Sequence, residues 1–95
     1  MTFQEFQTSL GIDTPPSCSP LLTALWWDGK GDWEKAHEIA QDIEDSDGAW
    51  VHAYLHRKEG DLWNADYWYA RAGKSRPDIT LKEEWQNISE DLLKR

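Results

Sequence analysis

Apolar residues recur every three or four positions along nearly the whole chain. No segment alternates apolar and polar residues for long enough to indicate a strand. Near the C-terminus, for example, Trp85, Ile88 and Leu92 fall on one face of a helix. Thr80 and Glu83 precede them as a capping-box pair, which satisfies free backbone amides where a helix begins. The pattern predicts an all-α fold.

Glycine, proline and capping residues divide this pattern into about six short helices. Ser19 and Pro20 suit an N-cap and a first helical position, whereas Gly31 and Gly60 end helices. Because most connections are short, we expect neighbouring helices to be antiparallel. The predicted helices cover approximately residues 3–10, 20–28, 32–44, 48–58, 61–73 and 80–92.

The two middle pairs of helices form an internal repeat with an offset of 29 residues, as from Gly31 to Gly60. Self-similarity at a fixed period is typical of repeated helical hairpins. A small residue in the first helix, Ala24 or Ala53, also aligns at this offset. The apolar stripes align as well. In the first helices, the stripe of Leu21, Leu22, Leu25 and Trp26 aligns with that of Trp50, Val51, Tyr54 and Leu55. In the second helices, the stripe of Trp33, Ala36, Ala40 and Ile43 aligns with that of Leu62, Ala65, Tyr69 and Ala72.

The segments GDWEKAHEIA and GDLWNADYWYARAGKSRP resemble the turn and second helix of tetratricopeptide (TPR) and related Sel1-like repeats, over about residues 20–77. Gly60 matches the family's small residue at the turn, Ala65 its small residue at the helix crossing, and Pro77 its closing proline. The offset is shorter than the usual TPR period of about 34 residues, and Gly48 stands where the first copy would have its closing proline. The resemblance implies two antiparallel hairpins whose first helices line a concave groove.

We therefore expect a single helical domain over residues 1–95. Its N-terminal helix and Pro/Ser-rich loop would occupy residues 1–19, the two hairpins residues 20–45 and 46–76, and a C-terminal capping helix residues 77–95. Two hairpins are fewer than such arrays usually need, so the terminal helices would have to cover the ends of the stack.

Composition and charge narrow the classes of function. The chain carries a formal net charge of −8 and has seven tryptophans among its 95 residues. Its acidic balance disfavours binding to nucleic acid, whose phosphates need clustered basic residues, and to anionic membrane surfaces. No apolar run is long enough to span a membrane. Most tryptophans are expected in the core, because large aromatics fill a small core with few residues.

The remaining sequence features point to a cytoplasmic, non-enzymatic protein. The segment MTFQEFQTSL has neither the basic nor the apolar stretch of a signal peptide. Cys18 is the only cysteine, so the chain can form no intrachain disulfide and no multi-cysteine zinc site. The sequence contains no glycine-rich phosphate loop and no recognisable nucleophile motif. We therefore predict no enzymatic activity and no cofactor.

His52, His56 and Glu59 are the candidate metal ligands of the chain. Two histidines four residues apart on a helix can share a zinc ion. The three residues cluster roughly opposite the apolar stripe of their helix, and Ala53 stands where a metalloprotease motif has its glutamate. We therefore expect a solvated polar face, with a metal site or a partner contact as the alternatives. His37 is expected to be a separate surface residue.

Two groups of residues are candidates for partner binding. The family resemblance places Trp50, Tyr54, Arg57 and Lys58 near the groove. There the two cations would meet an acidic peptide or a carboxylate.

Trp63 and Tyr67, four residues apart, form a second aromatic strip. We expect the strip to pack on the C-terminal helix around Trp85, with an exposed contact patch as the alternative. The function expected from the sequence is binding of a protein, a peptide or a second copy of the chain. Binding of a metal or of a small molecule in an aromatic pocket is the alternative.

Overall fold

A computed structural model describes all residues from 1 to 95 and contains six α-helices and no strand. The all-α prediction is confirmed. The helices are α1 (Phe3–Ser9), α2 (Pro20–Gly29), α3 (Trp33–Gln41), α4 (Ser46–Glu59), α5 (Leu62–Arg71) and α6 (Leu81–Leu93). None of the six is both long enough and apolar enough to cross a membrane.

The helices begin at the predicted capping residues, except for α4. The side chains of Ser19, Asp32 and Asp61 each accept a backbone N–H of the helix that follows. The hydroxyl of Thr80 accepts the amide of Glu83, whose carboxylate accepts the amide of Thr80, which completes the capping box. Local chemistry therefore determines where these helices start.

The start of α4 corrects a sequence prediction. We expected α4 to begin at Gly48, but Asp45 is its N-cap and accepts the Gly48 amide at 2.8 Å, so the helix starts at Ser46. A β-carbon at Gly48 would lie 1.9 Å from the carbonyl oxygen of Ile43. Gly48 is therefore part of the first helical turn, where only glycine lets the connection from α3 pass this closely.

The two hairpins, α2–α3 and α4–α5, repeat the same turn. Gly31 and Gly60 have φ angles of 90° and 89°, in the left-handed region that favours glycine. In both turns the glycine amide donates to the carbonyl three residues earlier, and the next amide donates to the carbonyl five residues earlier. The internal repeat seen in the sequence is therefore also a repeat of backbone geometry.

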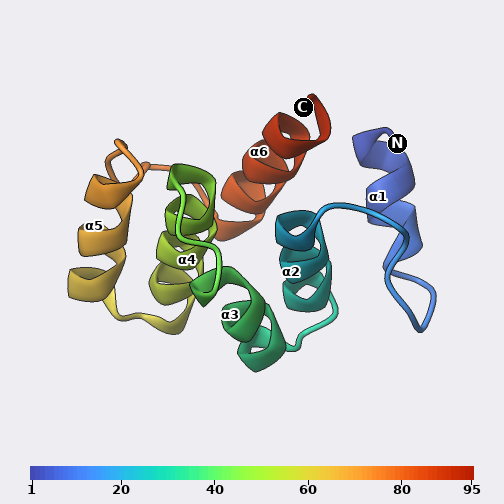
Figure 1. Cartoon of the computed structure of the whole chain (residues 1–95), viewed down its shortest axis with the longest axis horizontal. Helices are drawn as coiled ribbons and strands as arrows, with labels where there is room; N and C mark the ends of the chain where they lie inside the picture. Colours follow the sequence, from blue (N-terminus) through green and yellow to red (C-terminus); the bar gives the residue numbers. More distant parts are fainter.

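The hairpins stack so that α3 packs against α4, while α1 and α5 lie at opposite ends of the molecule (Figure 1). The main core lies between α2, α3, α4 and α6, with Phe6 of α1 inserted into it. A smaller cluster of Ala53, Ala65 and Tyr69 joins α4 to α5. Ala24 and Ala53, the small residues in the first helix of each hairpin, are both fully buried. These small residues let the helix axes approach closely.

Helix α6 occupies the face that the family resemblance assigns to a groove. It contacts α1, α2 and α4 (Figure 1). The indole N–H of Trp85 donates to the carbonyl of Leu25 at 2.9 Å, and the guanidinium of Arg57 donates to the buried carboxylate of Glu84 at 2.7 Å. The prediction of a free groove is wrong, because the C-terminal helix of the same chain fills that face.

The tryptophans are less buried than we expected. Trp26 and Trp85 are buried, and Trp63 is 81% exposed. The other four are half-buried, and they are Trp27, Trp33, Trp50 and Trp68. Several of these half-buried rings lie against a basic or imidazole side chain. For example, the Lys35 ammonium lies 4.1 Å from the centre of the Trp27 ring. The tryptophans therefore line interfaces between helices as much as they fill the core.

Candidate functional site

All three histidines of the chain meet where α3 packs against α4. The Nε2 atoms of His37 and His52 are 2.9 Å apart and share a hydrogen bond. One ring nitrogen from each of His37, His52 and His56 can be chosen so that the three atoms lie within 4.8 Å of one another. We call these three residues the histidine cluster. It joins the second helix of one hairpin to the first helix of the next.

Two tryptophans enclose the histidine cluster from either side. The ring of Trp33, one turn before His37 on α3, stacks on that imidazole with ring centres 4.8 Å apart. The ring of Trp68 on α5 stacks on His52 with ring centres 4.1 Å apart. The indole N–H of Trp33 also donates to the carbonyl of Leu55 at 2.7 Å. This bond fixes the Trp33 ring, so α3, α4 and α5 together position the imidazoles.

The burial of the histidine cluster corrects the sequence prediction. His52 and His56 are each only 7% exposed, whereas we expected a solvated face, and His37 is half-buried rather than a separate surface residue. The expectation of a solvated face treated α4 as an isolated helix. In the fold, α4 is covered by α3 on one side and by α5 on another, so its polar residues meet other helices.

Burial also changes the protonation of the histidine cluster. Loss of hydration, together with the neighbouring charges of His56 and His37, lowers the pKa of His52 to about 4. The pKa of His37 is lowered as well, first by burial and then by the charge of His56. These two imidazoles are therefore neutral at pH 7, which is the form that binds metal ions.

Glu59 supports the cluster from the next helical turn. Its Oε1 lies 2.6 Å from Nδ1 of His56. In the tautomer that donates Nδ1–H to Glu59, the lone pair of His56 is on Nε2. A carboxylate in this position holds a ligating histidine in one tautomer and orientation and raises its basicity. The structure therefore places Glu59 behind His56, although the sequence indicated it as a direct ligand.

The cluster offers the ligand set of a transition-metal site. Imidazole nitrogens suit Zn²⁺ and similar ions, and three histidines leave one tetrahedral position for water. In a tetrahedral zinc site the ligand nitrogens are about 3.3 Å apart, because each Zn–N bond is about 2.0–2.1 Å long. The pair of His37 and His52 is already at 2.9 Å, so an ion would replace the proton that these two rings share.

A second possible metal group is less suitable. Side-chain atoms of His56, Glu59 and Asp61 also lie close enough to share an ion, but both carboxylates are exposed. Asp61 caps α5, where its carboxylate accepts the backbone N–H of Asn64. Binding of an ion there would compete with the cap, whereas none of the three imidazoles caps a helix.

The residues predicted to line a groove lie apart from the histidine cluster. Tyr54 is buried, and its hydroxyl donates to Asp28 at 2.7 Å; Lys58 donates to the other oxygen of the same carboxylate at 2.8 Å. Arg57 pairs with Glu84 and also donates to the carbonyl of Ile79. Their predicted place in a free groove is wrong, since all three side chains hold the chain's own elements together.

Trp50 faces the connection between α5 and α6. The ammonium of Lys74 lies 4.1 Å from the centre of its ring, which is half-buried. Trp50 thus lies beside a cation of its own chain.

The aromatic strip of α5 is exposed instead of packed on α6. Trp63 and Tyr67 are 81% and 48% exposed, and their rings stack with centres 6.5 Å apart. Neither ring contacts Trp85, which stacks on Phe6 of α1. The expectation that the strip packs around Trp85 is wrong, and the alternative of an exposed patch matches its position.

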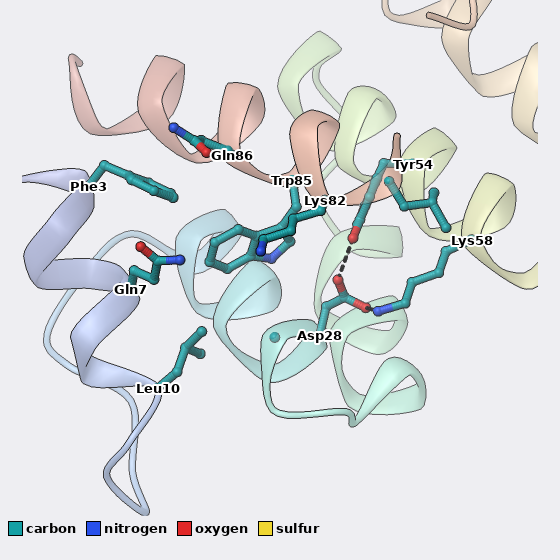
Figure 2. Close-up of a pocket in the computed structure, with 11 residues that line it drawn as sticks. Phe3, Gln7, Leu10, Asp28, Tyr54, Lys58, Lys82, Trp85 and Gln86 are labelled. Carbon is teal, nitrogen blue, oxygen red and sulfur yellow. Dashed lines mark hydrogen bonds and ion pairs between the residues drawn. The ribbon is translucent and has the colours of Figure 1, made fainter. Parts of the chain in front are cut away.

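A separate cavity of about 330 Å³ lies between α1, α2, α4 and α6 (Figure 2). Phe3, Gln7 and Leu10 extend into it from α1, opposite the side chain of Trp85. Tyr54 and Lys58 are at its other end, where Asp28 accepts both of their hydrogen bonds. Of the residues predicted from the sequence to bind a partner, only Tyr54 and Lys58 border this cavity.

Comparisons with protein-family models, with curated proteins and with solved structures find no match to this chain.

Proposed function

We propose that the protein binds one transition-metal ion, zinc or a chemically similar ion, between α3 and α4 through His37, His52 and His56. The single observation that carries the proposal is the convergence of every histidine of the chain at one buried point. Bound there, the ion would cross-link the two hairpins. Its ligands come from both, so neither hairpin alone would hold it.

The surroundings support the same proposal. Trp33 and Trp68 restrict the movement of two of the imidazoles, and Glu59 fixes the third, so little side-chain order is lost when an ion binds. Every buried side-chain polar atom of the chain has a hydrogen-bond partner. The ion must therefore compete with a satisfied cluster, which imidazole–metal bonds can do because each is stronger than the hydrogen bond it replaces.

Calorimetric titration of chelator-treated protein with ZnCl₂ tests the proposal. We expect one ion per chain and no binding of Mg²⁺ or Ca²⁺, which prefer oxygen ligands. Co²⁺ should give the visible spectrum of a tetrahedral nitrogen site. Zinc at 100 times its Kd should stabilise the fold by about 2.7 kcal/mol.

His37→Gln is the decisive variant, because His37 is the one ligand on α3. It should weaken zinc binding at least tenfold, and Glu59→Gln should weaken it about 10- to 100-fold. Glu34→Gln, an exposed α3 position outside the cluster, is the matched control and should bind as the parent does. Absence of zinc binding, or equal affinity in His37→Gln, would show that the cluster is only a hydrogen-bonded packing contact.

A second candidate function is favoured by the exposed strip on α5. Leu62, Trp63 and Tyr67 place large apolar side chains in solvent, and such a patch is typical of a contact surface. The net charge of −8 favours a partner protein that is basic around an apolar centre. We propose contact with such a partner as the runner-up.

A photo-crosslinker in place of Tyr67 would test this contact. A captured protein supports it only if the purified pair binds, if Trp63→Ala weakens binding about tenfold or more, and if high salt weakens it too. Trp27→Ala removes a half-buried ring elsewhere and should leave binding unchanged. Capture of a second copy of this chain would replace the basic partner with self-association.

A further inference from the structure

The cavity between α1, α2, α4 and α6 has the size of a small-molecule site. Its volume of about 330 Å³ lies within the range of roughly 300–1,000 Å³ that is usual for ligand pockets. Phe3, Leu10, Leu81 and Trp85 form its apolar walls (Figure 2). It shares no residue with the histidine cluster, so whatever it binds is independent of the metal proposal.

The walls of this cavity are held in place by specific bonds. The ammonium of Lys30 donates to the carbonyls of Leu10 and Ile12, both at 2.8 Å, and so ties the end of α1 to the end of α2. The indole N–H of Trp26 donates to the hydroxyl of Ser9 at 3.1 Å. Although α1 has only seven residues, it is therefore a fixed wall, and the cavity exists before any ligand enters.

Gly29 leaves space at the floor of the cavity. A β-carbon at Gly29 would lie 2.9 Å from a methyl group of Leu10 and 3.2 Å from the ring of Trp85. Its absence lets the aliphatic wall of α1 approach the aromatic wall of α6. The resulting slot suits an elongated or planar apolar group.

The charges around the cavity favour an anion. Asp28 is 2% exposed, and both of its oxygens already accept hydrogen bonds, one from Tyr54 and one from the ammonium of Lys58. The Asp28–Lys58 pair is therefore neutral as a whole. Lys82 also lines the cavity and forms no hydrogen bond or ion pair with the protein, which leaves one uncompensated positive charge.

The polar rim of the cavity provides further donors. Gln7 on α1 and Gln86 on α6 line it with exposed side chains, and neither amide is bonded to the protein. Each amide offers two N–H donors, and Lys82 offers a charged one. A carboxylate at the rim would therefore find donors while the apolar part of the same molecule lay against Phe3 and Trp85.

The geometry points to this cavity as a binding site for a small organic acid, a carboxylate on an aromatic ring or a short alkyl chain. A free inorganic anion would leave the apolar walls unused. A cationic ligand would meet an excess of positive charge, since Asp28 is already neutralised. The ligand class therefore combines one carboxylate with a small apolar body.

Titration of the full chain with 4-phenylbutyrate, followed by ¹H–¹⁵N NMR, tests the inference. The neutral 4-phenylbutyramide and the cationic 4-phenylbutylamine are the matched probes. We expect saturable shifts of the Trp85 indole N–H and of the Gln7 and Gln86 side-chain amides with the acid. The amide should bind more weakly and the amine should not bind.

Lys82→Gln removes the unpaired charge from an exposed position in the first turn of α6. It should weaken binding of 4-phenylbutyrate about fivefold, as expected for one solvent-exposed charge contact. Lys94→Gln makes the same change at the other end of α6 and should have no effect. Phe3→Ala should weaken binding of the acid and the amide equally, because it removes only apolar contact.

Three outcomes would overturn the inference. These are no saturable shifts with the acid, equal affinity for the acid and the amide, and an unchanged affinity in Lys82→Gln. Zinc titration of the same samples is unaffected by any of these results, because Lys82 and Phe3 lie outside the histidine cluster. A failure of the metal proposal can thus be told apart from a failure of this one.

Discussion

The two hairpins have the same turn geometry and different chemistry. At the turn, Gly31 and Gly60 differ by one degree in φ, and Asp32 and Asp61 cap the second helices in the same way. Yet Asp28 in the first hairpin aligns with Arg57 in the second, two residues of opposite charge. The offset of 29 residues therefore preserves the shape of the unit, while the charges differ according to what each copy contacts.

The two aligned residues serve different neighbours. Asp28 is an acceptor for Tyr54 and Lys58 of α4, so it joins the first hairpin to the second. Arg57 donates to Glu84 and to the carbonyl of Ile79, so it joins the second hairpin to α6. Each hairpin thus uses the same position to hold the element that packs against it next.

The histidine cluster lies between the two hairpins and takes residues from both, but it is not part of the repeated pattern. His37 aligns with Asp66, and His52 and His56 align with Thr23 and Trp27. No pair of histidines is therefore related by the repeat. At the interface between two copies, aligned positions can carry different residues in each copy. The three histidines occupy such positions.

The largest expected effect comes from breaking the Arg57 contact. Arg57→Met should destabilise the fold by about 3–5 kcal/mol, because it leaves the Glu84 carboxylate buried without its cation. Asp28→Asn should cost less, about 1–2 kcal/mol, since Lys58 is partly in solvent and is hydrated once it is released. Urea unfolding measures both values.

The double variant Arg57→Met/Glu84→Gln is the control for this comparison. It should recover part of the loss, because it removes the unpaired buried charge. Equal losses in the two single variants would show that the repeated position contributes equally in both hairpins.

Alkaline pH should weaken the fold through two buried tyrosines, both of which lie in the second hairpin. Burial, together with the carboxylate beside each hydroxyl, raises the pKa of Tyr54 and of Tyr69. The unfolded chain loses these protons above about pH 10 while the fold retains them. Stability from the neutral hydroxyls is therefore complete below pH 10 and is lost as the pH rises above it.

The expected slope is up to about 1.4 kcal/mol per pH unit for each tyrosine. Unfolding experiments between pH 9 and pH 12 should show a slope that becomes about half as steep in Tyr54→Phe and in Tyr69→Phe. Tyr67→Phe, at an exposed ring, is the control and should leave the slope unchanged. An unaltered slope in both buried variants would contradict the prediction.

The repeated turn predicts a matched pair of smaller effects. Gly31→Ala and Gly60→Ala should each cost about 1 kcal/mol, because alanine is strained at positive φ. A β-carbon at either glycine meets no atom within 4 Å, so backbone strain is the whole effect and the two losses should agree. Thermal unfolding tests this, and a clear difference between the variants would mean that the two turns are not energetically equivalent.

The smallest expected effect is at the exposed strip. Trp63→Ala should change the free energy of unfolding by less than about 0.5 kcal/mol, since the ring is 81% exposed. Trp33→Ala is the comparison, because that ring stacks on His37 and donates to Leu55. It should cost several times more. A large loss in Trp63→Ala would reveal a contact that burial does not indicate.

Features with a local cause could be predicted from the sequence, whereas contacts between distant segments could not. The caps at Ser19 and Thr80 and the turn at Gly60 depend on residues within one helical turn. By contrast, Trp85 bonds to Leu25 across 60 residues, so the position of α6 could not be derived from periodicity.

The candidate site was predictable only in part, for the same reason. His52 and His56 could be paired from their spacing, but His37 joins them through the packing of α3 on α4. One signal could have indicated it. In stacked hairpins the second helix of one copy faces the first helix of the next, so Trp33 and His37 were placed to meet His52 and His56.

Helix α6 packs on the first helices of the two hairpins, so this surface is already covered by a segment of the same chain. The connection that tethers α6 runs from residue 72 to residue 80, and it keeps the helix at a high local concentration. Severing this tether would turn an intramolecular contact into an association between two molecules. The helix could then leave, or exchange with that of another chain, once its contacts break, among them the bond from Trp85 to Leu25 and the ion pair of Arg57 with Glu84.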